Sequence, residues 1–184
     1  MNLRIRNKAI YLYVLLLLNC NVQLFAQSDS EKLFYDLTRN LISKYDSGKV
    51  ETAKQDIVTL EKLLPQFEDN WNYANAKHKI NLILGRIAVK NGEIAKAKYY
   101  LIEAGNSILY KVNSFGSEMT FGSPQLRSFG PNMSLAKELL EVGERKIVLE
   151  YFEICRKVWS GKIDEWAAHV RNGKVPDFGG NLKY

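Results

Sequence analysis

The sequence of 184 residues contains few of the residues on which catalytic and metal sites most often depend, with only two cysteines and two histidines. His78 and His169 are far apart in the chain and lack the paired spacing on one helix that a metal site requires. No phosphate-binding glycine loop and no metalloprotease or serine-hydrolase signature occurs. We therefore expect no catalytic residues, no metal and no cofactor.

The first residues predict export. Three basic residues, Arg4, Arg6 and Lys8, precede an apolar run over residues 9–18, which is the order of a secretory signal peptide. The run is shorter than the ~20 residues that a membrane-spanning helix needs, so we expect a signal that is cleaved and no transmembrane span in the mature chain. Residues 1–26 are thus the predicted signal, and the mature protein is predicted to be periplasmic or secreted.

The two cysteines make a lipid anchor and a disulfide bond within the chain unexpected. Cys20 could carry a lipid anchor, but Asn19 disfavours it because lipoprotein signals have a small residue at that position. Cys155 would be the only cysteine of the mature chain, so no disulfide within the chain can form. We expect Cys155 to be a buried small apolar residue and not a nucleophile.

The balance of charge argues against nucleic acid as a partner. Of the 26 basic residues three lie in the predicted signal, which leaves 23 against 20 acidic residues. The bases also alternate with acids along the chain, which is typical of solvated helix faces and not of a basic patch.

Apolar residues of the mature chain recur at intervals of three and four, which predicts amphipathic helices and an all-α fold. The predicted helices cover Leu33 to Tyr45, Val50 to Leu64, Ile80 to Ala88, Ile94 to Ile108, Leu135 to Leu140, Ile147 to Cys155 and Ile163 to Val170. Short breaks at Gly48, Gly92 and Gly143 separate them, and such breaks join antiparallel neighbours. The predicted unit is therefore the helical hairpin.

The hairpins share a pattern of small residues at fixed offsets. The central hairpin has Leu84-Gly85, Gly92, Ala97, Leu101 and Ala104, and the C-terminal hairpin has Leu135-Ala136, Gly143, Val148, Phe152 and Cys155. This pattern resembles the tetratricopeptide repeat, in degenerate form, because Asn81 and Ala88 replace aromatic residues of that family. The resemblance implies that residues 27–184 form a single domain of stacked hairpins, a right-handed solenoid.

Four Phe-Gly pairs distinguish the segments without a helical pattern, the predicted loop 112–131 and the predicted tail 174–184. The pairs are Phe115-Gly116, Phe121-Gly122, Phe129-Gly130 and Phe178-Gly179. Each phenylalanine could anchor its segment on the helices, or the loop could form a recognition surface. The aromatic residues near the C-terminus, Tyr151, Phe152, Trp159 and Trp166, are most simply a cap on the stack. We interpret His78, in a polar run, as a surface or helix-turn residue.

Together these features predict an exported helical-repeat adaptor that binds another envelope or secreted protein, without enzymatic activity. The residues expected to contact the partner are Tyr73, Asn81, Arg86 and Lys90 of the central hairpin and Phe121, Arg127 and Phe129 of the loop. An alternative is a small-molecule or glycan-binding module in which Trp159, Trp166 and Tyr184 stack on the ligand. A deep apolar pocket under the loop would favour the alternative.

Overall fold

The computed structural model describes residues 29–109, 111–114, 117–120 and 123–183. The described residues belong to two units, 29–37 and 38–183, and residues 29–37 are helical throughout. The predicted signal peptide, Cys20, Phe121 and Tyr184 lie outside the described residues.

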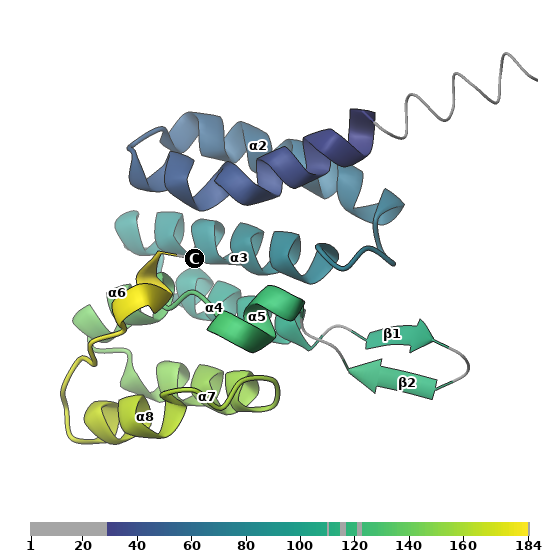
Figure 1. Ribbon diagram of the computed structural model, residues 1–184. Helices are drawn as coiled ribbons and strands as arrows, with labels where there is room; N and C mark the ends of the chain where they lie inside the picture. The colour runs from purple at the N-terminus through teal and green to yellow at the C-terminus, as the bar shows by residue number, and fades with distance from the viewer. Residues whose placement is uncertain (1–28, 110, 115–116, 121–122, 184) are drawn as a thin grey trace, which may run out of the picture. The chain divides into compact units, whose positions relative to one another are not determined.

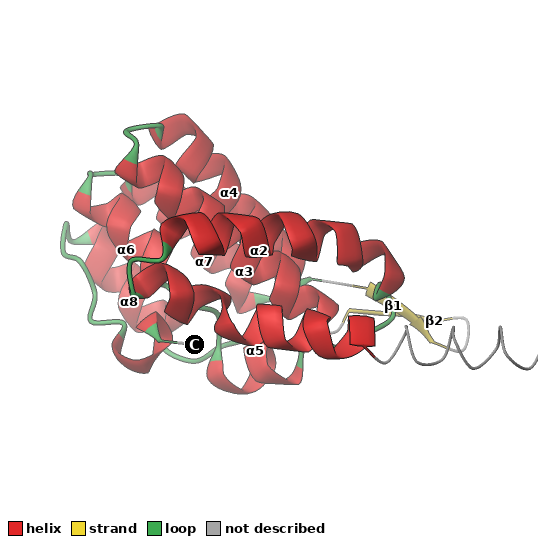
Figure 2. Ribbon diagram, turned by 90° about the horizontal axis from the view of Figure 1, so that it is seen from above, coloured by secondary structure: helices red, strands yellow, loops and turns green. Residues whose placement is uncertain are grey.

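The larger unit is built from helices, as the sequence predicts, and adds one short β-hairpin (Figures 1 and 2). After helical residues 38–46, the elements are α2 (Val50–Leu63), η1 (Leu64–Gln66), α3 (Tyr73–Lys90), α4 (Ile94–Ile108), β1 (Lys111–Ser114), β2 (Ser117–Thr120), α5 (Pro124–Phe129), α6 (Ser134–Glu141), α7 (Arg145–Arg156), α8 (Ile163–Arg171) and η2 (Gly179–Leu182). The long apolar stripes thus predicted the helices correctly. No helix among the described residues is both long and apolar enough to cross a membrane.

The segment predicted as one loop, 112–131, contains regular structure instead. Strands β1 and β2 pair antiparallel, with Lys111 opposite Thr120 and Ser114 opposite Ser117. Helix α5 follows because Ser123 caps it and Pro124 occupies its first turn, where a proline needs no N–H partner. The prediction of a loop without secondary structure was therefore wrong, since strands and helices this short leave no periodic apolar pattern.

Four helix ends share one turn, closed by a glycine with a positive φ. Gly48, Gly92, Gly143 and Gly173 have φ angles of 81°, 75°, 89° and 76°. At each one, the N–H of the following residue donates to the carbonyl five residues earlier, as Glu93 does to Ala88 over 2.8 Å. This pairing satisfies the last carbonyls of the helix, and a side chain would strain the turn. The predicted breaks at Gly48, Gly92 and Gly143 are confirmed.

Small residues bring the central helices close together. Helix α3 packs on α4 and α6, and α4 packs on α6 and α7. A Cβ atom at Gly85 of α3 would collide with the side chain of Leu135 on α6, and one at Gly105 of α4 would lie 3.0 Å from the ring of Tyr151 on α7. Both glycines therefore allow close helix contacts, at which an alanine would require the facing side chain to move.

An aromatic cluster joins α7, α8 and the C-terminal tail. Phe152, Trp166 and Phe178 are buried, and the rings of Trp166 and Phe178 lie 4.9 Å apart in an edge-to-face arrangement. The Nε1–H of Trp166 donates to the carbonyl of Asp177 over 3.2 Å. Phe178 therefore acts as an anchor for the tail, as one interpretation of the Phe-Gly pairs predicts.

Beyond Phe178, the tail lies against the segment that leads into α6. The side-chain amide of Asn181 donates to the carbonyls of Phe129 and Pro131, over 2.8 and 3.1 Å. The carbonyl of Asn181 in turn accepts from the N–H of Met133 over 2.7 Å. The tail thus fixes residues 129–133, of which Phe129, Gly130 and Asn132 line the pocket described below.

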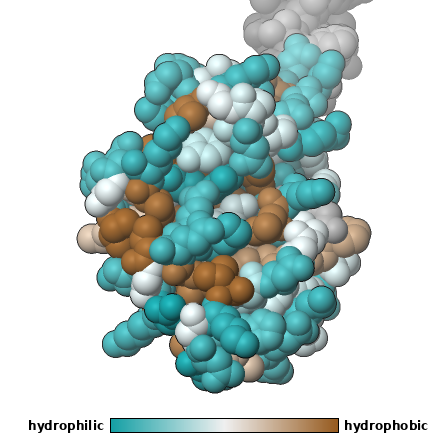
Figure 3. All heavy atoms as spheres, turned by 90° about the vertical axis from the view of Figure 1, so that its left-hand side faces the viewer, coloured by the Kyte–Doolittle hydropathy of each residue, from teal (hydrophilic) through white to brown (hydrophobic). Residues whose placement is uncertain are grey.

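Some large apolar side chains are exposed on the surface of the larger unit. Figure 3 shows one face on which apolar residues form patches separated by polar ones. The largest exposed apolar side chains on the described part of the larger unit include Val58, Trp71, Tyr99, Phe129, Val142 and Val175. Of these, Phe129 is the one that lines the pocket described below.

Candidate functional site

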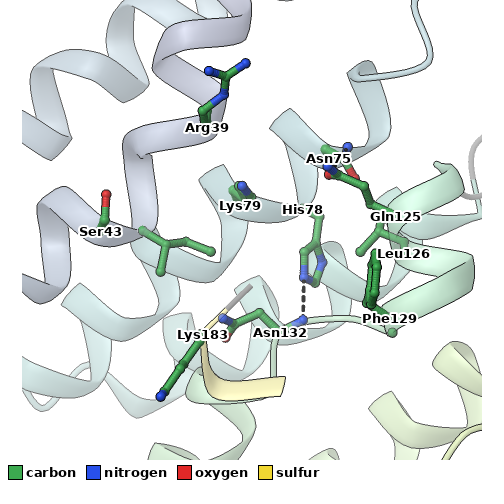
Figure 4. Close-up of a pocket in the computed structure, with 12 residues that line it drawn as sticks. Arg39, Ser43, Asn75, His78, Lys79, Gln125, Leu126, Phe129, Asn132 and Lys183 are labelled. Atoms are coloured by element: carbon green, nitrogen blue, oxygen red, sulfur yellow. Dashed lines mark hydrogen bonds between the residues drawn. The ribbon is translucent and has the colours of Figure 1, made fainter. Parts of the chain in front are cut away.

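A pocket of about 310 Å³ lies between the helical segment 38–46, α3, α5 and the last residues of the tail (Figure 4). It is lined by Arg39, Ile42, Ser43, Asn75, His78, Lys79, Gln125, Leu126, Phe129, Gly130, Asn132 and Lys183. Four separate stretches of the chain contribute to it, which is why no single motif in the sequence indicates it.

His78 forms part of the wall and is fully engaged by the main chain. The N–H of Asn132 donates to Nε2 over 3.3 Å, so Nε2 carries no proton, and Nδ1–H donates to the carbonyl of Ala104 over 3.0 Å. Burial, together with the nearby charge of Lys79, lowers the pKa of His78 to about 4, although the hydrogen bond to Ala104 acts in the opposite direction. The imidazole is therefore neutral and has no free nitrogen for a metal or a proton transfer.

The expectation that His78 lies on the surface was wrong, because the side chain is buried. The polar run around His78 does not mark an exposed surface, because Asn75 is buried as well. Within that run only Lys77 and Lys79 are partly exposed. Buried polar groups in such a run need partners that lie far away in the sequence.

A network of amides fixes the position of α5 on α3. The side-chain amide of Asn75 donates to Asn72 over 2.9 Å and to Gln125 over 3.0 Å. The hydroxyl of Ser123 donates to the carbonyl oxygen of Asn75 and accepts from the N–H of Leu126. Because α5 is only six residues long, these bonds and not its own helix determine where it lies.

The charges around the pocket are all positive. Arg39, Lys79 and Lys183 are lining residues, and no aspartate or glutamate occurs among the described residues of the lining. Lys79 donates to the carbonyl of Thr38 over 3.1 Å. Burial lowers the pKa of Lys79, and the adjacent charge of Arg39 lowers it further. Two like charges held close together favour an anion between them.

Gly130 allows the pocket wall to lie directly on an aromatic ring. Its φ is 81°, and a Cβ atom there would lie 2.6 Å from the ring of Trp159. Phe129 is 56% exposed and lines the pocket. In this Phe-Gly pair, therefore, the glycine makes the close contact and the phenylalanine is not a buried anchor.

The structure brings only part of the predicted contact set to this pocket. Phe129 lines it, and Arg127 lies on the same short helix. Tyr73 begins α3, where the ammonium group of Lys77 lies 5.5 Å from the centre of its ring. Lys90 is exposed at the other end of α3, more than four turns away.

Two further residues of the predicted set make contacts inside the fold. The amide of Asn81 donates to the carbonyl of Lys77 over 3.0 Å and to the hydroxyl of Ser107 over 3.3 Å. Arg86 pairs with Glu138 on α6 and with Asp46, at 2.8 and 2.6 Å. The contacts of Arg86 connect three helical segments of the larger unit.

The aromatic residues of the alternative hypothesis do not form an exposed stacking surface among the described residues. Trp166 is buried. Trp159 is half-buried, and its ring is so close to Gly130 and Gly161 that a Cβ atom at either would collide with it. The interpretation that these residues complete the core fits their positions better.

No family model matches the chain, and neither the curated proteins nor the solved structures contain a significant match to it. The fold and the pocket define a small helical protein with a preformed cationic pocket.

Proposed function

We propose that this chain is an exported helical-repeat adaptor that binds another protein of the cell envelope through the pocket beside α3. The observation that carries the proposal is the pocket itself. It is formed by side chains held in place by hydrogen bonds, and it combines cations with an exposed aromatic ring. Such a surface can recognise a ligand without rearrangement.

The repeated turn supports stacking of the tetratricopeptide type. The residue after each of Gly48, Gly92 and Gly143 has nearly the same conformation, with φ near −81° and ψ between 55° and 60°. Small residues at Gly85 and Ala136 stand at the same offset, seven residues before a turn glycine. Repetition of one hairpin geometry is the basis of solenoid repeats, which commonly present surfaces to other proteins.

A role in binding also fits the titratable groups of the larger unit. The two nitrogens of His78 are engaged, and burial raises the pKa of the Cys155 thiol to about 12. A general base or nucleophile works best with a pKa near the operating pH, which neither group has. The other polar side chains of the pocket are amides, cations and the hydroxyl of Ser43, which suit recognition.

The alternative is a small-molecule binding protein that uses the same pocket. A volume of about 310 Å³ lies at the lower end of the range of small-ligand sites. The alternative therefore assigns the pocket to a free ligand, whereas the adaptor proposal assigns it to a side chain of the partner.

Photo-crosslinking in the native cell envelope tests the adaptor proposal. Phe129 is replaced by benzoylphenylalanine, which keeps an aromatic ring at the edge of the pocket, and Tyr99 is replaced in a control protein. Tyr99 is 61% exposed on α4 and does not line the pocket. We expect a discrete protein adduct at position 129 and none of the same mass at position 99. Absence of an adduct at 129, or the same adduct at both positions, would refute the proposal.

A further inference from the structure

We propose that the pocket recognises an acidic side chain of a partner peptide, whose carboxylate binds between Lys79 and Arg39 while a neighbouring apolar residue packs on Phe129. This inference rests on the proposed function and gives it a ligand chemistry. It starts from the charges of the described lining residues, which include three cations and no carboxylate.

Several cations elsewhere in the larger unit have acidic partners. Lys44 pairs with Asp56, Lys98 with Glu144, and Arg86 with two carboxylates. Over the described residues, in contrast, Arg39 and Lys183 form no ion pair, and Lys79 donates only to a main-chain carbonyl. Holding Lys79 partly buried without a counter-ion is costly, and an anionic ligand would remove that cost.

The cations that line the pocket come from three separate segments of the chain. In Figure 4, Lys79 projects from α3 beside His78, Arg39 comes from the helical segment 38–46, and Lys183 comes from the tail. Arg39 and Lys183 are exposed, and their long side chains can turn toward a bound anion. The proximity of Arg39 to Lys79 is also seen in the lowered pKa of Lys79.

The polar groups of the pocket offer donors and few acceptors. The side-chain oxygens of Asn75, Gln125 and Asn132 already accept from Ser123, Asn75 and Ser134 respectively. Lys79 has three N–H donors and uses one, and Arg39 adds a planar fork of five. A ligand that supplies acceptors and negative charge therefore fits, and the arginine fork matches a carboxylate in particular.

A carboxylate fits this site better than a phosphate does. Phosphate sites commonly use main-chain N–H groups in addition to side chains. Here the N–H of Gly130 donates to Leu126, that of Asn132 donates to His78, and Pro131 has none. The segment that faces the ligand thus has no main-chain donor left at these positions, and recognition depends on side-chain cations.

The aromatic edge of the pocket favours a peptide over a free acid. Phe129 is more than half exposed beside the cations, whereas Ile42 and Leu126 provide the apolar floor. The pocket has room for one side chain, and Phe129 extends the apolar surface beyond it. A residue next to the acidic one in a peptide would cover this ring, which a small free acid would leave in water.

The test uses the exported protein and two capped pentapeptides, Gly-Phe-Glu-Phe-Gly and Gly-Phe-Gln-Phe-Gly, with affinity measured by NMR titration. The glutamate peptide should bind at least about tenfold more tightly than its uncharged counterpart, a difference of about 1.4 kcal/mol, because a charge-assisted contact is lost with glutamine. Lys79→Met and Arg39→Gln should each remove about that factor. Lys146→Met is the control, since Lys146 is exposed on α7 and does not line the pocket.

Each result has one meaning for the inference. Equal binding of the two peptides, or unchanged affinity in both variants with the fold intact by circular dichroism, would overturn it. Tighter binding of a phosphoserine peptide than of the glutamate peptide, or binding of 3-phenylpropionate but not of the peptide, would also overturn it. These outcomes are independent of the crosslinking result. If a partner is crosslinked at position 129 and its binding does not depend on Lys79 and Arg39, the adaptor proposal is retained and the inference of an acidic ligand is rejected.

Discussion

The main-chain N–H of Asn132 donates to Nε2 of His78, 54 residues earlier in the chain, over 3.3 Å. Through Nδ1 the same ring donates to the carbonyl of Ala104 on α4. One imidazole thus joins α3, α4 and the segment before α6, and it does so only in its neutral form. Protonation of His78 is therefore coupled to the stability of the fold.

The first prediction is a loss of stability in mild acid. The pKa of His78 is about 4 in the folded protein and 6.5 in the unfolded chain. Between these values the unfolded chain binds more protons, so the free energy of unfolding decreases as the pH falls from above 6.5 toward 4. The full shift corresponds to about 3 kcal/mol. Urea unfolding at several pH values across this range measures it.

The matched variant is His78→Gln, whose amide can donate to Ala104 and accept from Asn132 without titrating. We expect it to be less stable than the wild type near neutral pH, by about 1 to 3 kcal/mol, since the ring's packing is lost. The difference should shrink as the pH falls toward 4. A constant difference across the range would show that His78 is not the group responsible.

The second prediction concerns the contact between Gly130 and Trp159. Gly130 and Gly48 both have φ of 81°, but a Cβ atom would collide with Trp159 at Gly130 and meet nothing within 4 Å at Gly48. Gly48→Ala should cost about 1 to 2 kcal/mol from backbone strain alone. Gly130→Ala should cost a further 1 to 3 kcal/mol from overpacking. Equal losses in urea unfolding would contradict a close contact with Trp159.

The sequence predicted those parts of the molecule that depend on local pattern. Long apolar stripes and turn glycines have short-range causes, so the helices around Gly92 and Gly143 were predicted correctly. The hairpin at residues 111–120 and helix α5 were missed because tertiary bonds, such as those of Ser123 and Asn75, determine them. Elements that depend on distant partners leave no periodic signal.

The pocket was hidden from the sequence for a similar reason. Arg39, Lys79 and Lys183 come from three segments, and nothing in their linear spacing brings them together. Phe129 was expected at a binding surface because of its Phe-Gly pair, and it does line the pocket. The feature that could have indicated more is Asn132, the only asparagine directly after a proline. Its side-chain oxygen accepts a hydrogen bond from the N–H of Ser134, the first residue of α6.

The third prediction is that Asn181 stabilises the pocket wall. Its amide donates to the carbonyls of Phe129 and Pro131, so Asn181→Ala leaves both without these donors. We expect a loss of about 1 to 2 kcal/mol in global stability. Hydrogen exchange should also become faster at Met133, whose N–H donates to the carbonyl of residue 181. Asn172→Ala at the end of α8 serves as the control. Equally fast exchange at Met133 in this control would refute the role of Asn181 in stabilising the pocket wall.

The fourth prediction is that Cys155 does not react in the folded protein. The thiol is buried, and burial raises its pKa to about 12, so the thiolate fraction near neutral pH is very small. Iodoacetamide should leave the native protein unmodified over hours and should alkylate Cys155 rapidly in urea. Mass spectrometry distinguishes the two. Rapid modification under native conditions would mean that α7 opens readily from α4 and α8.

The fifth prediction concerns Arg86, which we expect to stabilise the fold through Asp46 and Glu138. Its side chain is largely buried, and its guanidinium lies 4.6 Å from the ring centre of Tyr45. Removal of Arg86 would leave the partly buried carboxylate of Glu138 without its cationic partner. Burial already raises the pKa of Glu138, and Arg86 opposes that rise. Arg86→Met should therefore lower the unfolding free energy by about 2 to 4 kcal/mol near neutral pH.

This loss of stability should depend on pH. Protonation removes the unpaired charge of Glu138, so the difference in unfolding free energy between the variant and the wild type should become smaller as the pH falls through the raised pKa of that carboxyl. Double substitution with Glu138→Gln should recover part of the loss, and an additive loss in the double variant would show that the two side chains do not depend on each other.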